Sequence, residues 1–88
     1  MKVEFLKKFS KDIDGLNLKP VKQAMMRLIE LMEAVDSLEK IPNTKKLTGH
    51  KTAYRTRIGD YRLGFFLEKS TILLARFVHR KDIYKVFP

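Results

Sequence analysis

The segment from residue 53 to residue 65 constrains the fold of this chain more than any other, because it has the pattern of a β-hairpin. Two runs rich in β-branched and aromatic residues flank Gly59-Asp60, and this pair is typical of a tight two-residue turn. We therefore expect Ile58 to pair with Tyr61, with antiparallel strands running away on either side. A hairpin of this kind predicts a β-sheet, and it decides which side chains share each face.

Arginines gather on one face of the expected hairpin. In that register Arg57 lies opposite Arg62, and Arg55 lies opposite Gly64, which we expect to leave open space beside the arginines. Because strand side chains alternate between faces, the three arginines project together. The opposite face then carries Tyr54, Thr56, Ile58, Leu63 and Phe65. Like charges directly opposite one another destabilise a sheet, and a bound anion would remove that cost.

The charge distribution also indicates an anionic partner. Residues 1–39 carry seven basic and seven acidic side chains, whereas residues 40–88 carry twelve basic and three acidic ones, so the net charge of +9 lies entirely in the second half. A small domain with one basic side favours nucleic acid as its partner, ahead of an acidic protein or an anionic membrane. The alternative is a solvated basic face without a partner, which arginines facing one another make less favourable.

Length and composition exclude several classes of protein. A chain of 88 residues forms one domain, residues 1–88, with one modest core. The absence of cysteine excludes a disulfide framework, a zinc knuckle and a cysteine nucleophile. No apolar run approaches the roughly 20 residues that cross a bilayer, and the N-terminus lacks the apolar core of a signal peptide. We therefore expect a soluble cytoplasmic protein with no membrane partner and, since no ligand cluster or glycine-rich phosphate loop is present, no metal and no cofactor.

The rest of the chain predicts an α+β fold in the order β-α-α-β-β-β. A first strand over residues 2–6 precedes a short amphipathic helix, and a second helix begins at Pro20 and presents an apolar stripe up to Val35. Residues 36–52 are expected to form a loop with one helical turn near residues 37–40. The remaining strands are expected at residues 53–58, 61–67 and 72–78. We expect a single antiparallel sheet with the α-hairpin packed on one face and the basic face open.

Arg76 conflicts with strict alternation in the last strand. Its position places it on the same side as Leu74 and Val78, which are apolar. Either a β-bulge or an edge position for this strand would resolve the conflict.

Two stretches of the sequence resemble a known family. The pattern Tyr-Arg-x-Arg-x-Gly-Asp-Tyr-Arg-Leu-x-Phe at residues 54–65, followed by an apolar strand that runs into Val-His-Arg-Lys-Asp-Ile-Tyr at residues 78–84, resembles the RelE/ParE superfamily of toxins from toxin–antitoxin pairs. The resemblance implies a small sheet with an α-hairpin on one face and a cognate antitoxin protein as partner. For the RelE branch it implies cleavage of messenger RNA on the ribosome, and for the ParE branch inhibition of DNA gyrase.

RNA cleavage without a metal requires a ribose 2′-hydroxyl to attack the adjacent phosphate. The protein must hold that phosphate in position and stabilise the negative charge that develops on its oxygens. Arginine suits both tasks because its planar fork binds phosphate oxygens bidentately. The resemblance makes Arg62 the phosphate clamp and places Arg80 on the leaving-group side. Arg55 and Arg57 match positions that carry lysines in the best-known members. Since arginine stays protonated, Arg57 is expected to stabilise charge, and the general base is left open.

Other residues near this site have two possible roles. His79 has an ordinary pKa near neutral, so it either carries a proton or only caps the strand end. Tyr84 matches a family aromatic that stacks on a base; the alternative is that it packs the tail onto the sheet, which is the role we expect for Phe87. Contacts with the RNA backbone are expected from Lys45, Lys46, Lys51 and Lys81, and His50 is expected to be a surface residue.

Three functions are therefore open. The first is a ribosome-dependent RNA endonuclease, the second is a gyrase-inhibiting toxin that cleaves no RNA, and the third is an inactive basic module that keeps only antitoxin binding. The clustered arginines, His79-Arg80 and Tyr84 favour the first.

Overall fold

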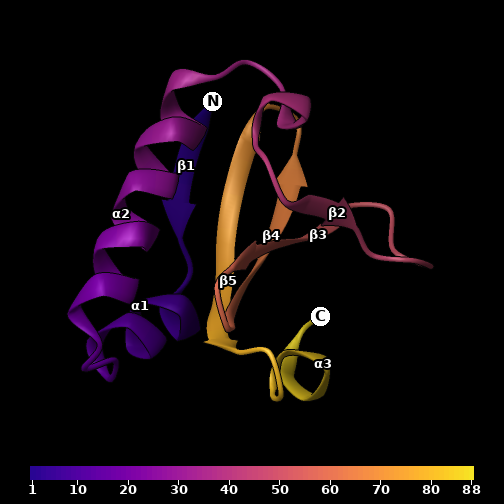
Figure 1. Cartoon of the computed structure of the whole chain (residues 1–88). Helices are drawn as coiled ribbons and strands as arrows, with labels where there is room; N and C mark the ends of the chain where they lie inside the picture. The colour runs from indigo at the N-terminus through magenta and orange to yellow at the C-terminus, as the bar shows by residue number, and fades with distance from the viewer.

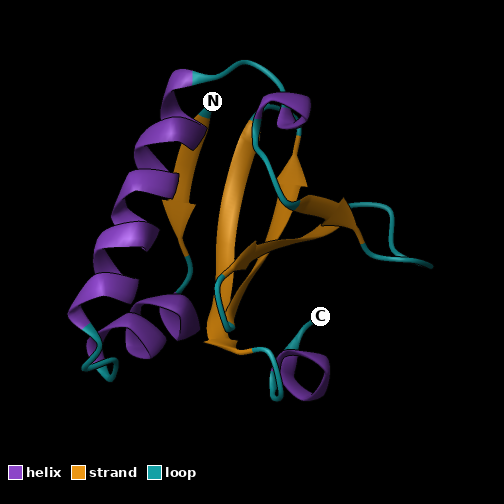
Figure 2. Cartoon of the chain, viewed as in Figure 1, coloured by secondary structure: helices purple, strands orange, loops and turns teal.

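A computed structural model describes residues 1–88 as a five-stranded sheet with two helices on one face and a short helix on the other (Figure 1; Figure 2). The elements are β1 (Lys2–Phe5), α1 (Lys7–Asp14), α2 (Lys19–Ala34), the 3-10 turn η1 (Leu38–Lys40), β2 (Thr44–Lys46), β3 (Ala53–Ile58), β4 (Tyr61–Glu68), β5 (Thr71–His79) and α3 (Ile83–Val86). This architecture confirms the expected α+β fold. No helix has the length and apolar character that a membrane span requires.

The sheet has the strand order β1-β5-β4-β3-β2. Strand β1 pairs with β5 in parallel, and the other three pairings are antiparallel. The expectation of a purely antiparallel sheet is therefore wrong for β1. This strand is joined to its neighbour through the helices and the hairpins, the long kind of connection that a parallel pair needs.

Strand β2 was not expected, since its residues fall in the predicted loop. It pairs with β3 over three positions, Thr44 with Thr56, Lys45 with Arg55 and Lys46 with Tyr54. A strand this short and polar, close to Pro42 and Gly49, has no hydrophobic alternation by which a sequence pattern could reveal it.

The hairpin of β3 and β4 has the expected register. Ile58 pairs with Tyr61, and Arg57 pairs with Arg62. Gly59 in the turn has a φ of 57°, which a residue with a Cβ adopts only with strain. The arginines therefore lie on one face of the sheet, as predicted.

A β-bulge in β5 resolves the position of Arg76. Gly64 pairs with Arg76 but the next residue, Phe65, pairs with Leu74, so Ala75 has no partner of its own. Because β5 lies between β1 and β4, the bulge and not an edge position is the correct explanation. The released Arg76 side chain reaches Asp12 of α1, with Nε and Nη2 donating to the carboxylate at 2.8 and 3.1 Å.

The main core lies between the sheet and the two long helices. Its fully buried side chains come from both layers: Phe9, Met25, Met32, Leu63, Phe65, Ile72 and Leu74. Burying a side chain of this size stabilises the fold by about 1.5–3 kcal/mol. The apolar stripe of α2 supplies Met25 and Met32 to this core.

The opposite face is only partly open. A small cluster of Ala53, Ala75, Ile83 and Phe87 holds α3 against it. Gly64 lies under the Phe87 ring, so the expected open space at Gly64 is filled, and a Cβ there would come within 2.5 Å of ring atoms. The expected packing of Phe87 onto the sheet is confirmed.

Candidate functional site

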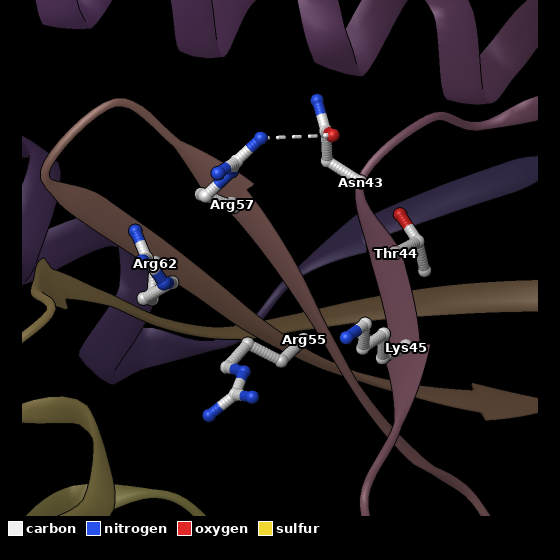
Figure 3. Close-up of a pocket in the computed structure, with 6 residues that line it drawn as sticks. All are labelled: Asn43, Thr44, Lys45, Arg55, Arg57 and Arg62. Carbon is white, nitrogen blue, oxygen red and sulfur yellow. Dashed lines mark hydrogen bonds between the residues drawn. The ribbon is translucent and has the colours of Figure 1, made fainter.

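A basic cavity opens on the sheet face away from α1 and α2. Its volume is about 470 Å³, and its lining is free of hydrophobic residues: Asn43, Thr44, Lys45, Arg55, Arg57 and Arg62. Figure 3 shows these side chains rising from three neighbouring strands and the residue before β2. We refer to this cavity as the arginine pocket.

The sheet register builds the arginine pocket. Alternation places Arg55 and Arg57 on one face of β3, and cross-strand pairing brings Arg62 opposite Arg57 and Lys45 opposite Arg55. Asn43, which has a φ of 60°, accepts a hydrogen bond at 3.3 Å from Nη2 of Arg57 (Figure 3). Sequence reasoning missed Asn43, although an asparagine after Pro42 is a signal for a left-handed turn residue.

The pocket concentrates positive charge. The pKa of Arg62 lies below its ordinary value, first because of partial burial and then because of the charges of Arg55, Arg57 and Arg80. Its Nη1 donates to the carbonyls of Gly59 at 2.9 Å and Tyr61 at 2.8 Å, which leaves Nε and Nη2 free for another acceptor. Salt bridges form elsewhere in the chain, at Lys2–Glu4, Asp36–Lys40 and Asp12–Arg76, but none forms at these arginines. The arginine pocket is therefore positively charged and has no internal counter-ion.

The C-terminal helix α3 places an aromatic ring against Arg55, at the edge of the arginine pocket. The hydroxyl of Tyr84 accepts a hydrogen bond from Nη1 of Arg55, and the Arg55 guanidinium lies 4.9 Å from the ring centroid. The Tyr84 side chain remains 73% exposed. That exposure contradicts the alternative in which Tyr84 packs the tail onto the sheet, and it leaves ring surface for a ligand.

A second recess lies beside the arginine pocket. Its volume is about 450 Å³, and it shares Lys45 and Arg55 with the first cavity. Its remaining lining comes from the end of β2 and the loop after it, and from α3 and the residues that follow it: Lys46, Leu47, Thr48, His50, Tyr84, Phe87 and Pro88. His50 is exposed, as expected, but it lines this recess.

The structure separates His79 from the arginines. His79 pairs with Tyr61, and the two rings meet edge to face at 5.6 Å on the side of the sheet that the long helices cover. Its Nδ1 accepts a hydrogen bond at 3.2 Å from the backbone N–H of Lys81. This geometry supports the role of a strand-end cap over that of a proton carrier.

The other predicted site residues lie around the pocket in different ways. Arg80 is exposed just past β5, where its backbone N–H donates to the Asp60 carbonyl at 2.8 Å and its charge acts on Arg62. Lys46 and Lys51 flank the loop after β2, and Lys81 is exposed in the turn after β5. The structure thus brings together Arg55, Arg57, Arg62, Arg80, Tyr84 and Lys45.

Comparison with known proteins finds full-length relatives, although no family model matches the chain. The sequence is 36% identical to Toxin RelE3 of Methanocaldococcus jannaschii over the whole of both chains.

Solved structures agree with this comparison. The crystal structure of the RelB-RelE antitoxin-toxin complex from Methanococcus jannaschii contains a chain that is 33% identical, with a TM-score of 0.83 and coverage of 97% of this chain and 99% of that one. The archaeal RelE-RelB complex from Pyrococcus horikoshii shares the fold, with a TM-score of 0.70, 23% identity and coverage of 90% and 93%.

Proposed function

The chain belongs to the RelE family of toxins, and we propose that it is the toxin of a toxin–antitoxin pair that inhibits translation by cleaving messenger RNA on the ribosome. Membership follows from a full-length relative at 36% identity. The activity is inferred from the site and from the resemblance of the two motif stretches to the RelE branch.

The observation that carries the proposal is the arginine pocket. Three arginines and one lysine surround a cavity that holds no carboxylate, on a face where Arg57 and Arg62 lie opposite each other. A phosphodiester would relieve this repulsion and accept hydrogen bonds from the guanidinium N–H groups that have no partner within the chain. The pocket therefore suits an RNA phosphate better than an apolar or cationic ligand.

The reaction proposed is an in-line attack of a ribose 2′-hydroxyl on the adjacent phosphorus. The new P–O2′ bond forms as the P–O5′ bond breaks, giving a 2′,3′-cyclic phosphate upstream and a 5′-hydroxyl downstream. Arg62 and Arg57 would stabilise the charge on the non-bridging oxygens, a contribution of about 3–4 kcal/mol for a well-placed donor. The arginines stay protonated, so the 2′-hydroxyl proton passes to another group or to water, and the departing 5′-oxygen takes up a proton from water to become the 5′-hydroxyl.

Arg80 and Tyr84 extend the proposed site beyond the arginine pocket. Arg80 is exposed just past β5, and the role proposed for it beside the departing 5′-oxygen comes from the family resemblance. Tyr84 is fixed by Arg55 and presents an exposed ring, which suits stacking on a base next to the cut. His79 lies on the other face and is given no chemical step.

The partner proposed is a cognate antitoxin with an acidic or amphipathic segment. Relatives of this chain were solved as RelB-RelE complexes. The outer edges of β1 and β2 carry no neighbouring strand, so an extended segment could add to the sheet, and the basic face would attract acidic side chains. Co-purification of the chain with the product of the adjacent gene tests this partner.

The test of the activity is expression of the chain alone, followed by mapping of transcript ends and isolation of ribosome-bound messages. Cuts within translated regions, with 5′-hydroxyl ends downstream, are the expected result. Intact messages with accumulating double-strand DNA breaks would instead support gyrase inhibition. Intact messages and unimpaired growth would support an inactive module that only binds the antitoxin.

A further inference from the structure

We propose that the recess beside the arginine pocket is a nucleobase subsite, and that Thr48 and His50 on its wall set which nucleotide is accepted next to the cut. This inference rests on the proposed function and adds to it a residue-level basis for sequence preference. The residues that carry it lie in the loop between β2 and β3, which projects from the edge of the sheet (Figure 1).

The two cavities are neighbours. They share Lys45 and Arg55 as lining residues, so an RNA strand whose phosphate lies among the arginines would carry an adjacent nucleotide to the recess. Consecutive nucleotides of one strand are covalently linked, and the subsite is therefore defined relative to the scissile phosphate. This linkage gives the recess a fixed register on the message.

The lining of the recess suits a flat aromatic ring with polar edges. Phe87, which is 5% exposed, and the half-buried Leu47 form an apolar floor, and the 73% exposed Tyr84 ring forms a side. Apolar surfaces and an aromatic ring stack on any base, so they supply affinity without choice of base. The choice has to come from hydrogen-bonding groups on the remaining wall, and the loop supplies Thr48 and His50.

The loop holds these two side chains in a defined turn. The N–H of His50 donates to the Leu47 carbonyl at 3.2 Å, and Gly49 between them has a φ of 82°. A positive φ at this third position is the requirement of a type II turn, which glycine meets without strain. The Leu47 N–H in turn donates to the Ala53 carbonyl at 2.9 Å, which ties the turn to β3. The wall is therefore built on a closed turn at the end of a strand pair.

The hydroxyl of Thr48 offers one donor and two acceptor positions, and the neutral imidazole of His50 offers one donor and one acceptor. Two such groups at fixed places on the wall favour the base whose exocyclic amino and carbonyl groups are complementary to both. The discrimination expected from them is up to roughly tenfold.

The test is single-turnover cleavage of programmed ribosomes by Thr48→Val and His50→Ala, on messages that differ in one nucleotide beside the cut. The expected result is a change of roughly tenfold in the ratio of rates between messages, with little change in melting temperature because both side chains are exposed. Thr52→Val is the matched control, since Thr52 is exposed in the same loop but does not line the recess. It should leave the ratio unchanged.

Two outcomes would overturn the inference while leaving the proposed function in place. Equal slowing on all messages would mean that the loop contacts the RNA backbone. An unchanged ratio combined with weaker antitoxin binding would assign the recess to the protein partner. Failure of the parent chain to cut any message would instead refute the proposed function.

A second measurement does not depend on cleavage. Messages carrying 4-thiouridine at single positions are bound to ribosomes together with the Arg62→Ala variant and irradiated. The inference expects a crosslink to Tyr84 or to residues 47–50 from one position only. Crosslinks from all positions, or from none, would overturn it.

Discussion

Arg62 and Arg76 lie on neighbouring strands of one sheet but have opposite electrostatic surroundings. Arg76 donates two hydrogen bonds to the Asp12 carboxylate, at 2.8 and 3.1 Å, and this contact raises its pKa above the ordinary value. Arg62 has its pKa lowered by partial burial and by three nearby arginines. The charge of Arg76 is thus neutralised by a carboxylate, whereas Arg62 belongs to a cluster of arginines that no carboxylate neutralises.

This difference in electrostatic surroundings indicates different roles for the two arginines. Asp12 also accepts the N–H of Phe77 at 2.9 Å, so its pair with Arg76 fastens α1 to β5 just after the bulge. At the arginine pocket the nearest acid in sequence, Asp60, lies in the hairpin turn and forms no salt bridge. A paired arginine stabilises the fold, whereas an unpaired cluster costs stability and gains its counter-ion only from a ligand.

The largest expected effect comes from removing the unpaired arginine that the site needs. Arg62→Ala should lower single-turnover cleavage roughly 100- to 1000-fold, the loss expected for a transition-state contact of about 3–4 kcal/mol. The melting temperature should change little, since the relief of repulsion with Arg57 offsets the loss of the hydrogen bonds from Arg62 to the Gly59 and Tyr61 carbonyls. Lys69→Ala, in the distant turn between β4 and β5, is the control and should cut normally. A variant that cuts as fast as the parent would show that the pocket is not the reaction site.

Removing the carboxylate that pairs with Arg76 should lower the stability of the fold and leave the arginine pocket intact. Asp12→Asn weakens the contact to Arg76 and leaves that guanidinium largely uncompensated, so we expect a loss of about 2–3 kcal/mol in the free energy of unfolding. Asp14→Asn, on the same helix but exposed and unpaired, should change little. Urea unfolding of the two variants measures the difference. Equal stability of both variants would mean that the Asp12 pair does not fasten the helix.

A third substitution tests whether the arginine pocket depends on the packing of Phe87 against Gly64. In Gly64→Ala the new Cβ would lie within 2.5 Å of the Phe87 ring, so the tail must shift, at a cost of about 1–3 kcal/mol. Gly15→Ala, where a Cβ meets only ordinary contacts, is the matched control. If the displaced tail carries Tyr84 away from Arg55, cleavage falls more than the melting temperature explains. Unchanged stability in the Gly64 variant would mean that the tail is loosely held.

Much of this contrast could be predicted from the sequence. The Gly59-Asp60 turn determined the register of β3 and β4, and with it the shared face of Arg55, Arg57 and Arg62. The misfit of Arg76 pointed to the bulge. These features are local, because turn geometry and alternation depend on residues that are close in the chain.

The rest depends on contacts between distant parts of the chain. Asp12 and Arg76 are 64 positions apart, and no periodicity links them. The parallel pairing of β1, the short strand β2 and the placement of Phe87 on Gly64 are likewise set by tertiary packing. His79 lies on the helix-covered face because the bulge at Ala75 shifts the alternation of β5, and the motif resemblance did not indicate this face.

The smallest expected effect concerns the loss of stability that results from placing Arg57 opposite Arg62. Arg57→Thr removes one charge from an exposed strand position and supplies a good strand former, so we expect a gain of about 0.5 kcal/mol in the free energy of unfolding at low salt. High sodium chloride screens the repulsion in the parent and should narrow the gap. Inorganic phosphate should stabilise the parent more than the variant, because an anion bound in the pocket favours the folded state. Thermal melts of both proteins at low salt, at high salt and in phosphate measure these shifts.

If Arg57→Thr is the less stable protein at low salt, the hydrogen bond from Arg57 to Asn43 outweighs the repulsion between Arg57 and Arg62. Arg57 would then resemble Arg76 in supporting the fold, and the distinction between the two regions would hold for Arg62 alone.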